Sequence, residues 1–155
     1  MAKPIKRSVH IVQLSKEHHF SLLFCWKVRT GLKKQIDVNR IIAYVNYFWK
    51  DHLLPHFSEE DILFNEVDDE LVRRAYNEHY EINKLVQSLE NQEDKAVTIS
   101  QIVDLVDRHV RFEERELFPH LENAISEPKL IEVGKKLKHV QPEVAQDTFP
   151  DDFWK

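Results

Sequence analysis

Two stretches of the chain pair a histidine with a glutamate four residues later. His56 precedes Glu60 in H-F-S-E-E, and His109 precedes Glu113 in H-V-R-F-E. On an α-helix, residues four positions apart lie on one face, about 5–6 Å from each other. An imidazole and a carboxylate held in this way can bind the same metal-containing centre. A further histidine lies upstream of each pair, at His18 and His79. The spacing therefore predicts a metal site inside a bundle of four helices.

The elements that would position these residues are helices. Two glycines in 155 residues and abundant Leu, Glu and Lys favour an all-α fold. Apolar residues at three- and four-residue steps predict four long helices, at about 15–31, 37–66, 68–89 and 98–121. Short connections make antiparallel neighbours, so we expect an up-down-up-down four-helix bundle. A short fifth helix at about 128–139 and an irregular C-terminal tail should follow. Residues 1–155 should form a single domain, with its core at about 10–125 and an extension at about 126–155.

Several local features predict where the helices begin, bend and end. Ser15 is a suitable N-cap and Gly31 a suitable C-cap for the first helix. Thr98 to Gln101 is typical of a capping box at the start of the fourth. Pro55 falls inside the second helix, where it should produce a kink or bulge. The aromatic residues of the tail should pack it against the bundle; they are Phe149, Phe153 and Trp154.

The stripes that should face the core carry the candidate ligands. Glu60 and Glu113 occupy positions where a bundle would place leucine, and a glutamate is rarely fully buried unless it is paired or bound to a cation. Two divalent or trivalent cations would supply the compensating charge. Imidazole with carboxylate suits iron, zinc, copper or nickel. One histidine on an apolar stripe is more often a hydrogen-bonded core residue, so the prediction depends on four helices each contributing one.

Four segments resemble the hemerythrin-like, or HHE cation-binding, family: L-S-K-E-H-H at 14–19, H-F-S-E-E at 56–60, E-H at 78–79 and H-V-R-F-E-E-R-E-L-F-P at 109–119. The resemblance covers about residues 10–125 and implies a non-haem di-iron centre inside the bundle. It implies that Glu60 and Glu113 bridge two iron ions, together with an oxo or hydroxo bridge. The terminal ligands that it implies are His18, His56, His79 and His109.

Two positions leave a choice of ligand. His18 and His19 are adjacent and only one can face the centre; the phase of the apolar stripe favours His18. Glu60 stacks on the histidine of its own helix better than Glu59, although a twist at Pro55 would admit Glu59.

His52 is a seventh candidate ligand. It precedes His56 by four residues, so it should project onto the same face about 6 Å along the axis. We expect a fifth imidazole ligand or near-ligand, with a proton partner as the alternative. Hemerythrins that carry oxygen have an extra H-x-x-x-H pair on one helix. The third predicted helix lacks it, because Ala75 and Asn83 occupy the required positions.

The expected function is the binding or sensing of O2, NO or peroxide at two iron ions, with zinc and manganese as alternative metals. A dry pocket would favour binding, and the aromatic residues available for its walls are Phe20, Phe24, Phe48, Trp49 and Phe112. The alternative is an enzyme that reduces O2, peroxide or NO with a proton from His52, Tyr44, Tyr47 or Tyr76. A third reading is metal storage or a metal-free bundle, but the Glu-x-x-His motifs of ferritin-type bundles are missing at the matched positions.

Composition limits the partners and the compartment. The net charge is −5 with both signs interspersed, so we expect no nucleic acid partner. No apolar run approaches the ~20 residues that cross a bilayer, so we expect no membrane. Cys25 is the only cysteine, which excludes an intramolecular disulfide and favours the cytoplasm. It should be a buried structural thiol, since no basic residue flanks it to activate it.

Overall fold

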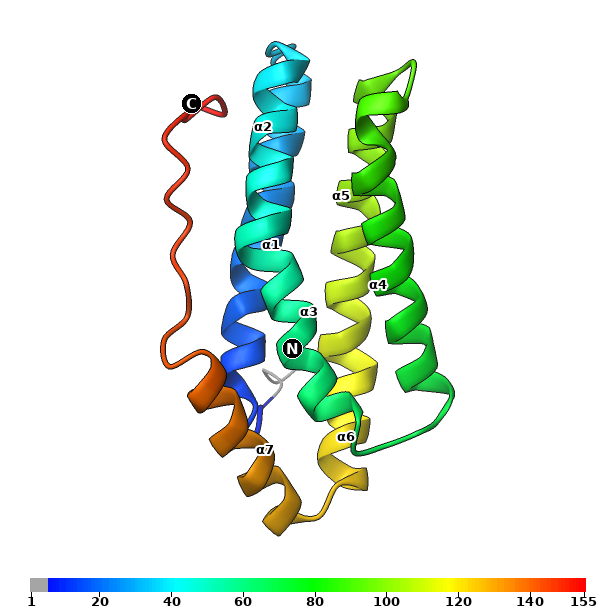
Figure 1. Ribbon diagram of the computed structural model, residues 1–155, viewed down its shortest axis with the longest axis vertical. Coiled ribbons are helices and arrows are strands. Elements are labelled where there is room, and N and C mark those ends of the chain that lie inside the picture. Colours follow the sequence, from blue (N-terminus) through cyan, green and yellow to red (C-terminus); the bar gives the residue numbers. More distant parts are fainter. Residues whose placement is uncertain (1–5) are drawn as a thin grey trace, which may run out of the picture.

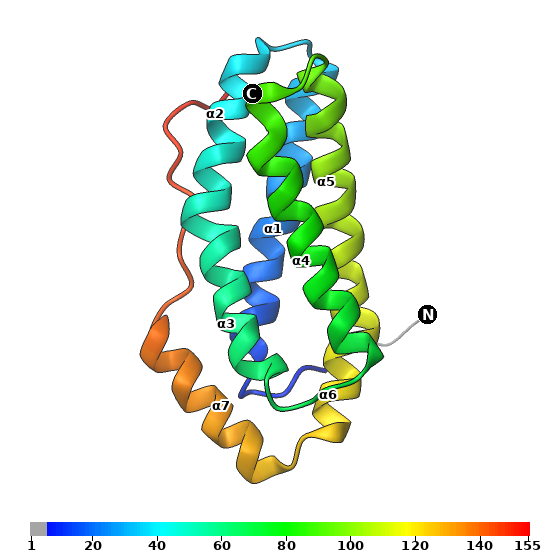
Figure 2. The same cartoon turned by 45° about the vertical axis from the view of Figure 1, so that its right-hand side comes forward.

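The computed structural model describes residues 6–155, which form helices and connecting segments without a β-strand. Four long helical segments, called legs here, lie side by side, and successive legs run in opposite directions (Figure 1, Figure 2). This arrangement confirms the expected all-α bundle. The first leg is α1 (Val12–Lys33) and the third is α4 (Glu70–Ser88), which ends in the 3-10 turn η2 (Leu89–Asn91). The second leg joins α2 (Val38–Phe48), the π-helical turn η1 (Trp49–Leu53) and α3 (Leu54–Phe64). The fourth joins α5 (Lys95–Phe112), the π-helical turn η3 (Glu113–Leu117) and α6 (Phe118–Ala124).

The π-helical turn η1 confirms the bulge that was expected near Pro55. Proline has no amide hydrogen, so it cannot donate to the carbonyl four residues back. Here the preceding residue, Leu54, donates instead to the carbonyl of Trp49, five residues back. A second π-helical turn, η3, precedes Pro119 in the same way, since Phe118 donates to the carbonyl of Glu113. The sequence analysis did not predict this second bulge.

The caps predicted for the first helix are wrong. α1 extends beyond both of them, and Ser15 lies inside it with its hydroxyl donating to the Glu114 carboxylate at 2.7 Å. Gly31 also lies inside α1, where it makes room for the tail. A Cβ at this position would lie 2.6 Å from the Phe153 ring. The glycine is therefore explained by packing and not by a helix end.

The capping box predicted for the fourth helix is also wrong. α5 begins at Lys95 because the side chain of Asp94 accepts the Val97 amide at 3.1 Å. Thr98 is buried one turn inside the helix, and its hydroxyl donates to the Asp94 carbonyl. The third leg begins with α4 at Glu70, because the side chain of Asp69 accepts the Val72 amide at 3.1 Å.

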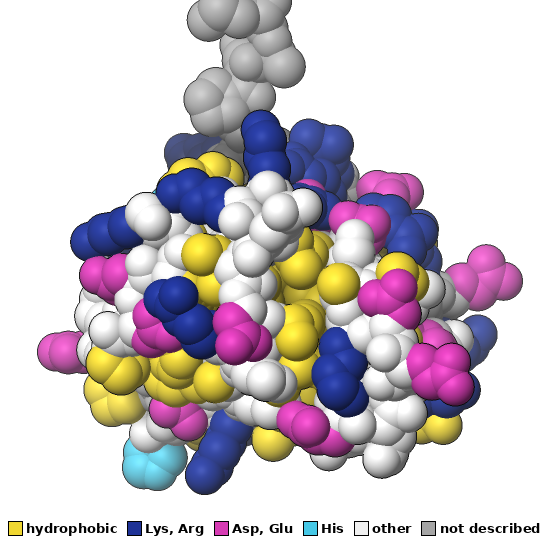
Figure 3. Space-filling view, turned by 90° about the horizontal axis from the view of Figure 1, so that it is seen from above, with side chains coloured by type: hydrophobic (Ala, Val, Ile, Leu, Met, Phe, Trp, Pro, Cys, Tyr) yellow, Lys and Arg dark blue, Asp and Glu magenta, His cyan; other side chains and the backbone are white. Residues whose placement is uncertain are grey.

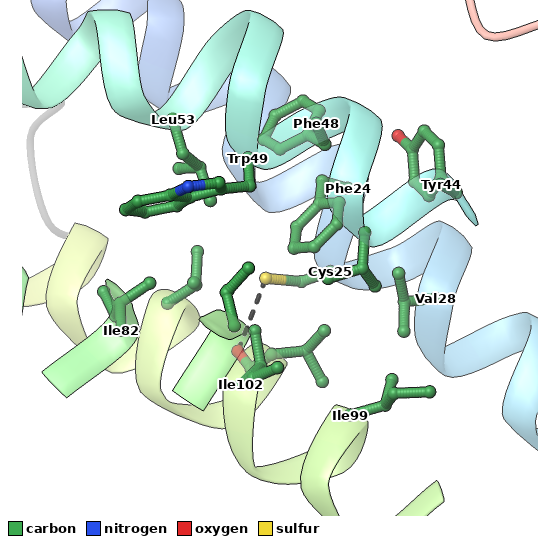
Figure 4. Close-up of a cluster of buried hydrophobic side chains, with 14 of the residues drawn as sticks. Phe24, Cys25, Val28, Tyr44, Phe48, Trp49, Leu53, Ile82, Ile99 and Ile102 are labelled. Atoms are coloured by element: carbon green, nitrogen blue, oxygen red, sulfur yellow. Dashed lines mark hydrogen bonds between the residues drawn. The ribbon is translucent and has the colours of Figure 1, made fainter. Parts of the chain in front are cut away.

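The core consists of two apolar clusters, which a buried histidine or glutamate separates on each of the first three legs; on the fourth leg, His109 and Glu113 lie on either side of the change from one cluster to the other. On α1, for example, Leu14 belongs to one cluster and Phe24 to the other, with His18 between them. Figure 4 shows part of the second cluster, in which the Cys25 thiol donates to the carbonyl of Val103 at 3.4 Å. Burial raises the pKa of Cys25 to about 12, which fits the structural thiol that was expected.

The extension after the bundle follows the prediction closely. The fifth helix is α7 (Glu127–Val140), and the tail then runs back along the first two legs (Figure 1). Phe153 is fully buried, while Phe149 and Trp154 pack against the same cluster. The Lys27 ammonium lies 3.1 Å from Asp147 of the tail, and both side chains are almost entirely buried. The tail is therefore part of the folded core.

Seen from the end where α1 meets α2 and α4 meets α5, the surface mixes basic, acidic and apolar side chains (Figure 3). Within residues 6–155, no helix is long and apolar enough to cross a membrane.

Candidate metal centre

Six buried side chains, contributed by all four legs, meet in the polar layer between the two apolar clusters. α1 supplies His18, α3 supplies both His56 and Glu60, α4 supplies His79, and the fourth leg supplies His109 and Glu113. Both carboxylates are 0 % exposed, and none of the four imidazoles exceeds 9 %. The residues that the histidine–glutamate spacing singled out are therefore brought together.

The carboxylate of Glu60 divides its two oxygens between the two halves of this layer. Its Oε2 lies 3.4 Å from Nε2 of His18 and 3.3 Å from Nε2 of His56. Its Oε1 faces the other way and lies 2.9 Å from Nε2 of His79.

Glu113 is arranged in the same manner from the opposite side of the bundle. Its Oε1 lies 2.9 Å from Nε2 of His18, and its Oε2 lies 3.1 Å from Nε2 of His109 and 3.6 Å from Nε2 of His79. Each carboxylate thus presents one oxygen to each pair of imidazoles, which is the arrangement a bridging ligand requires.

The layer therefore contains two adjoining groups of ligand atoms that share both carboxylates. One comprises His18, His56, Glu60 and Glu113, the other Glu60, His79, His109 and Glu113, and one ligand atom from each member lies within 4.8 Å of the others. Six buried atoms in the layer have no conventional hydrogen-bond partner: Nε2 of His56, His79 and His109, both oxygens of Glu60, and Oε2 of Glu113. Buried polar atoms are normally satisfied, and a set made of imidazole nitrogens and carboxylate oxygens fits metal cations.

Without a metal, the imidazoles and carboxylates must compensate one another. Burial opposes the charged form of Glu60, but His56, His18 and His79 hold its pKa well below the ordinary value. Burial likewise opposes charge on His56 and His109, yet the carboxylates around them raise their pKa values to about 10 and about 9.

Three of the imidazoles are oriented by a carboxylate on their outer side. Nδ1 of His56 lies 2.7 Å from Glu17, and Nδ1 of His109 lies 2.7 Å from Glu78. Nδ1 of His18 completes the set at 2.8 Å from Glu114. A carboxylate at Nδ1 fixes the ring and leaves Nε2 free to bind a metal.

The sequence analysis did not identify these outer carboxylates, although a signal was present. Each is the immediate neighbour in sequence of a residue in the layer, as Glu17 is of His18, and each supports a histidine from a different helix. The helical period assigns such neighbours to a different face, so only the packing of the legs reveals which histidine they reach.

Aromatic rings enclose the layer on both sides. Phe57 stacks on His79 with ring centroids 3.8 Å apart, and Phe118 stacks on His18 at 5.2 Å. Of the predicted wall residues, four are buried in the two clusters and Phe20 lines a cavity beside the layer. Phe57 and Phe118, which contact the imidazoles directly, were not among them.

The structure separates the adjacent candidates. His18 is buried in the layer whereas His19 is exposed. Glu60 points into the layer, and Glu59 is also buried but points elsewhere, accepting a hydrogen bond from Gln13 at 2.9 Å. Burial and the nearby carboxylate of Glu17 raise the pKa of Glu59 to about 8.

His52 is not brought together with the other six residues. Its Nε2 lies 3.1 Å from the Tyr47 hydroxyl, and its ring stacks on Phe48. The cause is η1, which contains His52: a π-helical turn takes more residues than an α-helical turn, so four positions before His56 is no longer the same face. Of the other predicted proton donors, Tyr44 bonds Asp147 of the tail and Tyr76 bonds Asn65.

Comparison with known proteins gives one match. The family described as the hemerythrin HHE cation binding domain matches residues 10–121, a span that contains all six residues of the layer. No curated protein matches the chain, and no solved structure does.

Proposed function

The chain belongs to the hemerythrin HHE cation-binding family, and from this premise we propose that it holds two non-haem iron ions and binds O2, NO or peroxide at them. His18 and His56 would hold one ion, His79 and His109 the other. Glu60 and Glu113 would bridge them. Two ions are supported because each carboxylate directs one oxygen toward His18 and His56 or one of them, and the other oxygen toward His79 and His109 or one of them.

The donor set also supports ligand binding. Each ion would receive two imidazole nitrogens and two carboxylate oxygens from the chain. Iron with such a donor set supplies redox chemistry and positions open to a small ligand when bound. The outer carboxylates Glu17, Glu78 and Glu114 hold the imidazoles in place, while Phe57 and Phe118 exclude water from the two halves.

A di-iron enzyme that reduces O2, peroxide or NO is the second candidate, because one observation favours it. A cavity of about 90 Å³ borders His56 and is also lined by His52. The hydrogen bond between His52 and Tyr47 would supply a proton donor at this cavity. Turnover of peroxide that is lost in His52→Ala, with the metal content intact, would favour this candidate over simple binding.

The first test is metal analysis. Full-length protein reconstituted anaerobically with Fe²⁺ should contain two ions per chain, and O2 or NO should induce a visible absorption band that is absent from the metal-free protein. One ion or fewer per chain would contradict the dinuclear centre. Two ions with no spectral response to O2, NO or peroxide would contradict the ligand-binding role and leave metal binding standing.

Stability offers a second measurement. Binding to the folded state alone stabilises it by about 4 kcal/mol at a thousandfold excess of ligand over its dissociation constant. For a domain of this size that corresponds to a melting temperature higher by roughly 10 °C. A transition unaffected by chelator would support the metal-free bundle. The proposed compartment is the cytoplasm, since Cys25 is a buried free thiol.

A further inference from the structure

The cavity of about 90 Å³ beside His56 is covered by the C-terminal tail and is lined by three acidic residues, Glu17, Asp51 and Glu59, of which Glu17 and Glu59 lie at its base beside His56. Val144 and Ala145 of the tail cover it, and Phe20 and Phe48 form apolar walls. Glu17 and Glu59 line the side that faces the metal layer. The cavity therefore leads from the tail to the outer side of one candidate ligand.

The two carboxylates at this base are poorly compensated. Glu59 is 2 % exposed and its described donor is the neutral amide of Gln13. Glu17 takes the Nδ1 hydrogen of His56, which can neutralise only one of the two. Within residues 6–155, no lysine or arginine forms an ion pair with either carboxylate. A cation held between the two acids would compensate the second carboxylate.

The geometry also suits a cation. One ligand atom each from Glu17, Glu59 and His56 lies within 4.8 Å of the others, and this grouping shares only His56 with the two in the metal layer. Glu59 contributes no atom to those two groups although it is as deeply buried as their members. The cavity gives space beside the carboxylates for water to complete a coordination shell.

We propose that Glu17 and Glu59 form an outer site for a divalent transition-metal ion, through which ions pass into the metal layer. That the ions continue into the metal layer rests on the function proposed above, whereas the outer site itself does not. His56 is the partition between the two places, since Nδ1 lies 2.7 Å from Glu17 and Nε2 lies 3.3 Å from Glu60. An ion held at Glu17 and Glu59 would be one imidazole ring away from the fully buried Glu60.

The experiment follows metal uptake and metal position. Metal-free full-length protein is mixed anaerobically with Fe²⁺, and the rate of uptake is compared with the final number of ions. Glu59→Gln should slow uptake roughly tenfold or more, because a neutral amide is a weaker metal ligand than a carboxylate, and should still end with two ions. Glu59→Asp, which keeps the carboxylate, should restore most of the rate. Glu66→Gln is the matched control, because it makes the same substitution at an exposed position two residues beyond the end of the same helix and should change the rate less than about twofold.

Crystals of the full chain soaked in Mn²⁺ give an independent readout. Anomalous density between Glu17 and Glu59, in addition to that in the layer, is the expected result. Uptake at the wild-type rate in Glu59→Gln, with no density at the outer site, would show that the two acids simply share a proton and would overturn the proposal. A Glu59→Gln protein that ends with fewer than two ions would also overturn it, since Glu59 would then belong to the centre. If the proposed dinuclear centre is itself wrong, the wild-type protein will hold fewer than two ions, which distinguishes that result from failure of the outer site.

Discussion

The ring of Phe57 lies flat against the imidazole of His79, with centroids 3.8 Å apart and planes 10° from parallel. His79 is the one imidazole of the layer for which the structure records no carboxylate at Nδ1. The aromatic ring therefore takes over the orienting role that Glu17, Glu78 and Glu114 have for the other three.

Replacing Phe57 by Leu should loosen the half of the centre that contains His79 and His109. The substitution keeps most of the volume and should cost only about 1 kcal/mol of unfolding free energy. Loss of an orienting contact should nevertheless speed release of one ion to a chelator by roughly tenfold. Phe118→Leu is the matched control and should change release less, because Glu114 still orients His18 in the other half. Release of both ions at unchanged rates in Phe57→Leu would show that the stacking has no orienting role.

Glu60→Gln and Glu113→Gln should each reduce the metal content below two ions per chain. An amide offers a neutral and weaker donor where both halves of the centre need a carboxylate oxygen. Glu59→Gln, one residue away and equally buried, should retain two ions at equilibrium. Elemental analysis of the three variants after reconstitution decides the matter, and the reverse ranking would mean that Glu59 is the bridging residue.

The dependence of stability on pH should change sign when the metal is removed. In the metal-free protein, His56 and His109 have pKa values of about 10 and about 9, above the ordinary value of about 6.5. Their contribution is complete below that ordinary pKa and is lost as the pH rises through 9 to 10. The metal-free protein should therefore melt at lower temperature as the medium becomes alkaline.

With metal bound, the coordinating nitrogens carry no proton, so acid competes with the metal. The loaded protein should lose stability as the pH falls. Thermal melts between about pH 6 and 10, with and without chelator, measure both slopes. Parallel curves would contradict the assignment of these histidines as ligands.

His52→Ala should leave two ions per chain and an unchanged resting spectrum, because His52 bonds Tyr47 and stacks on Phe48. His18→Ala, which removes a nitrogen from the layer, serves as the positive control and should lower the metal content. Loss of an ion in His52→Ala would instead restore the prediction of a fifth imidazole ligand.

Asp147→Ala should destabilise the protein strongly, since it leaves the buried Lys27 ammonium without its partner at 3.1 Å. Removing one member of a buried pair costs about 3–5 kcal/mol. Asp151→Ala breaks the exposed pair with Arg40 in the same tail and should cost less than about 1 kcal/mol. Urea denaturation of both variants measures the difference, and equal losses would mean that the tail contributes through its aromatic residues alone.

Predictions based on spacing hold wherever the helix between two residues is regular. His56 and Glu60 share an uninterrupted stretch of α3, so the four-residue rule places them correctly on one face of the helix. The same rule fails for His52 because His52 lies within η1, where the helix is no longer regular. The sequence indicated a bulge at Pro55 but not how many residues it absorbs, and the face on which His52 lies depends on that number.

Contacts between legs were less accessible to prediction. Glu17 reaches His56 across the bundle, and no periodicity within α1 connects the two. Gly31 illustrates the same limit: a glycine near a helix end suggests a cap, whereas here the Phe153 ring occupies the space of its side chain. Both relationships depend on which helices pack together, which short-range patterns do not contain.

The packing of Phe153 against Gly31 also means that the tail can dock only at the end of synthesis. Residue 31 leaves the ribosome long before residue 153, and at about 5–20 residues per second the delay lasts several seconds. Until the tail has been synthesised, it cannot cover the space beside Gly31, the ammonium of Lys27 or the cavity beside His56. A nascent bundle would therefore be most accessible to incoming metal before its tail arrives, and docking of the tail would close that period.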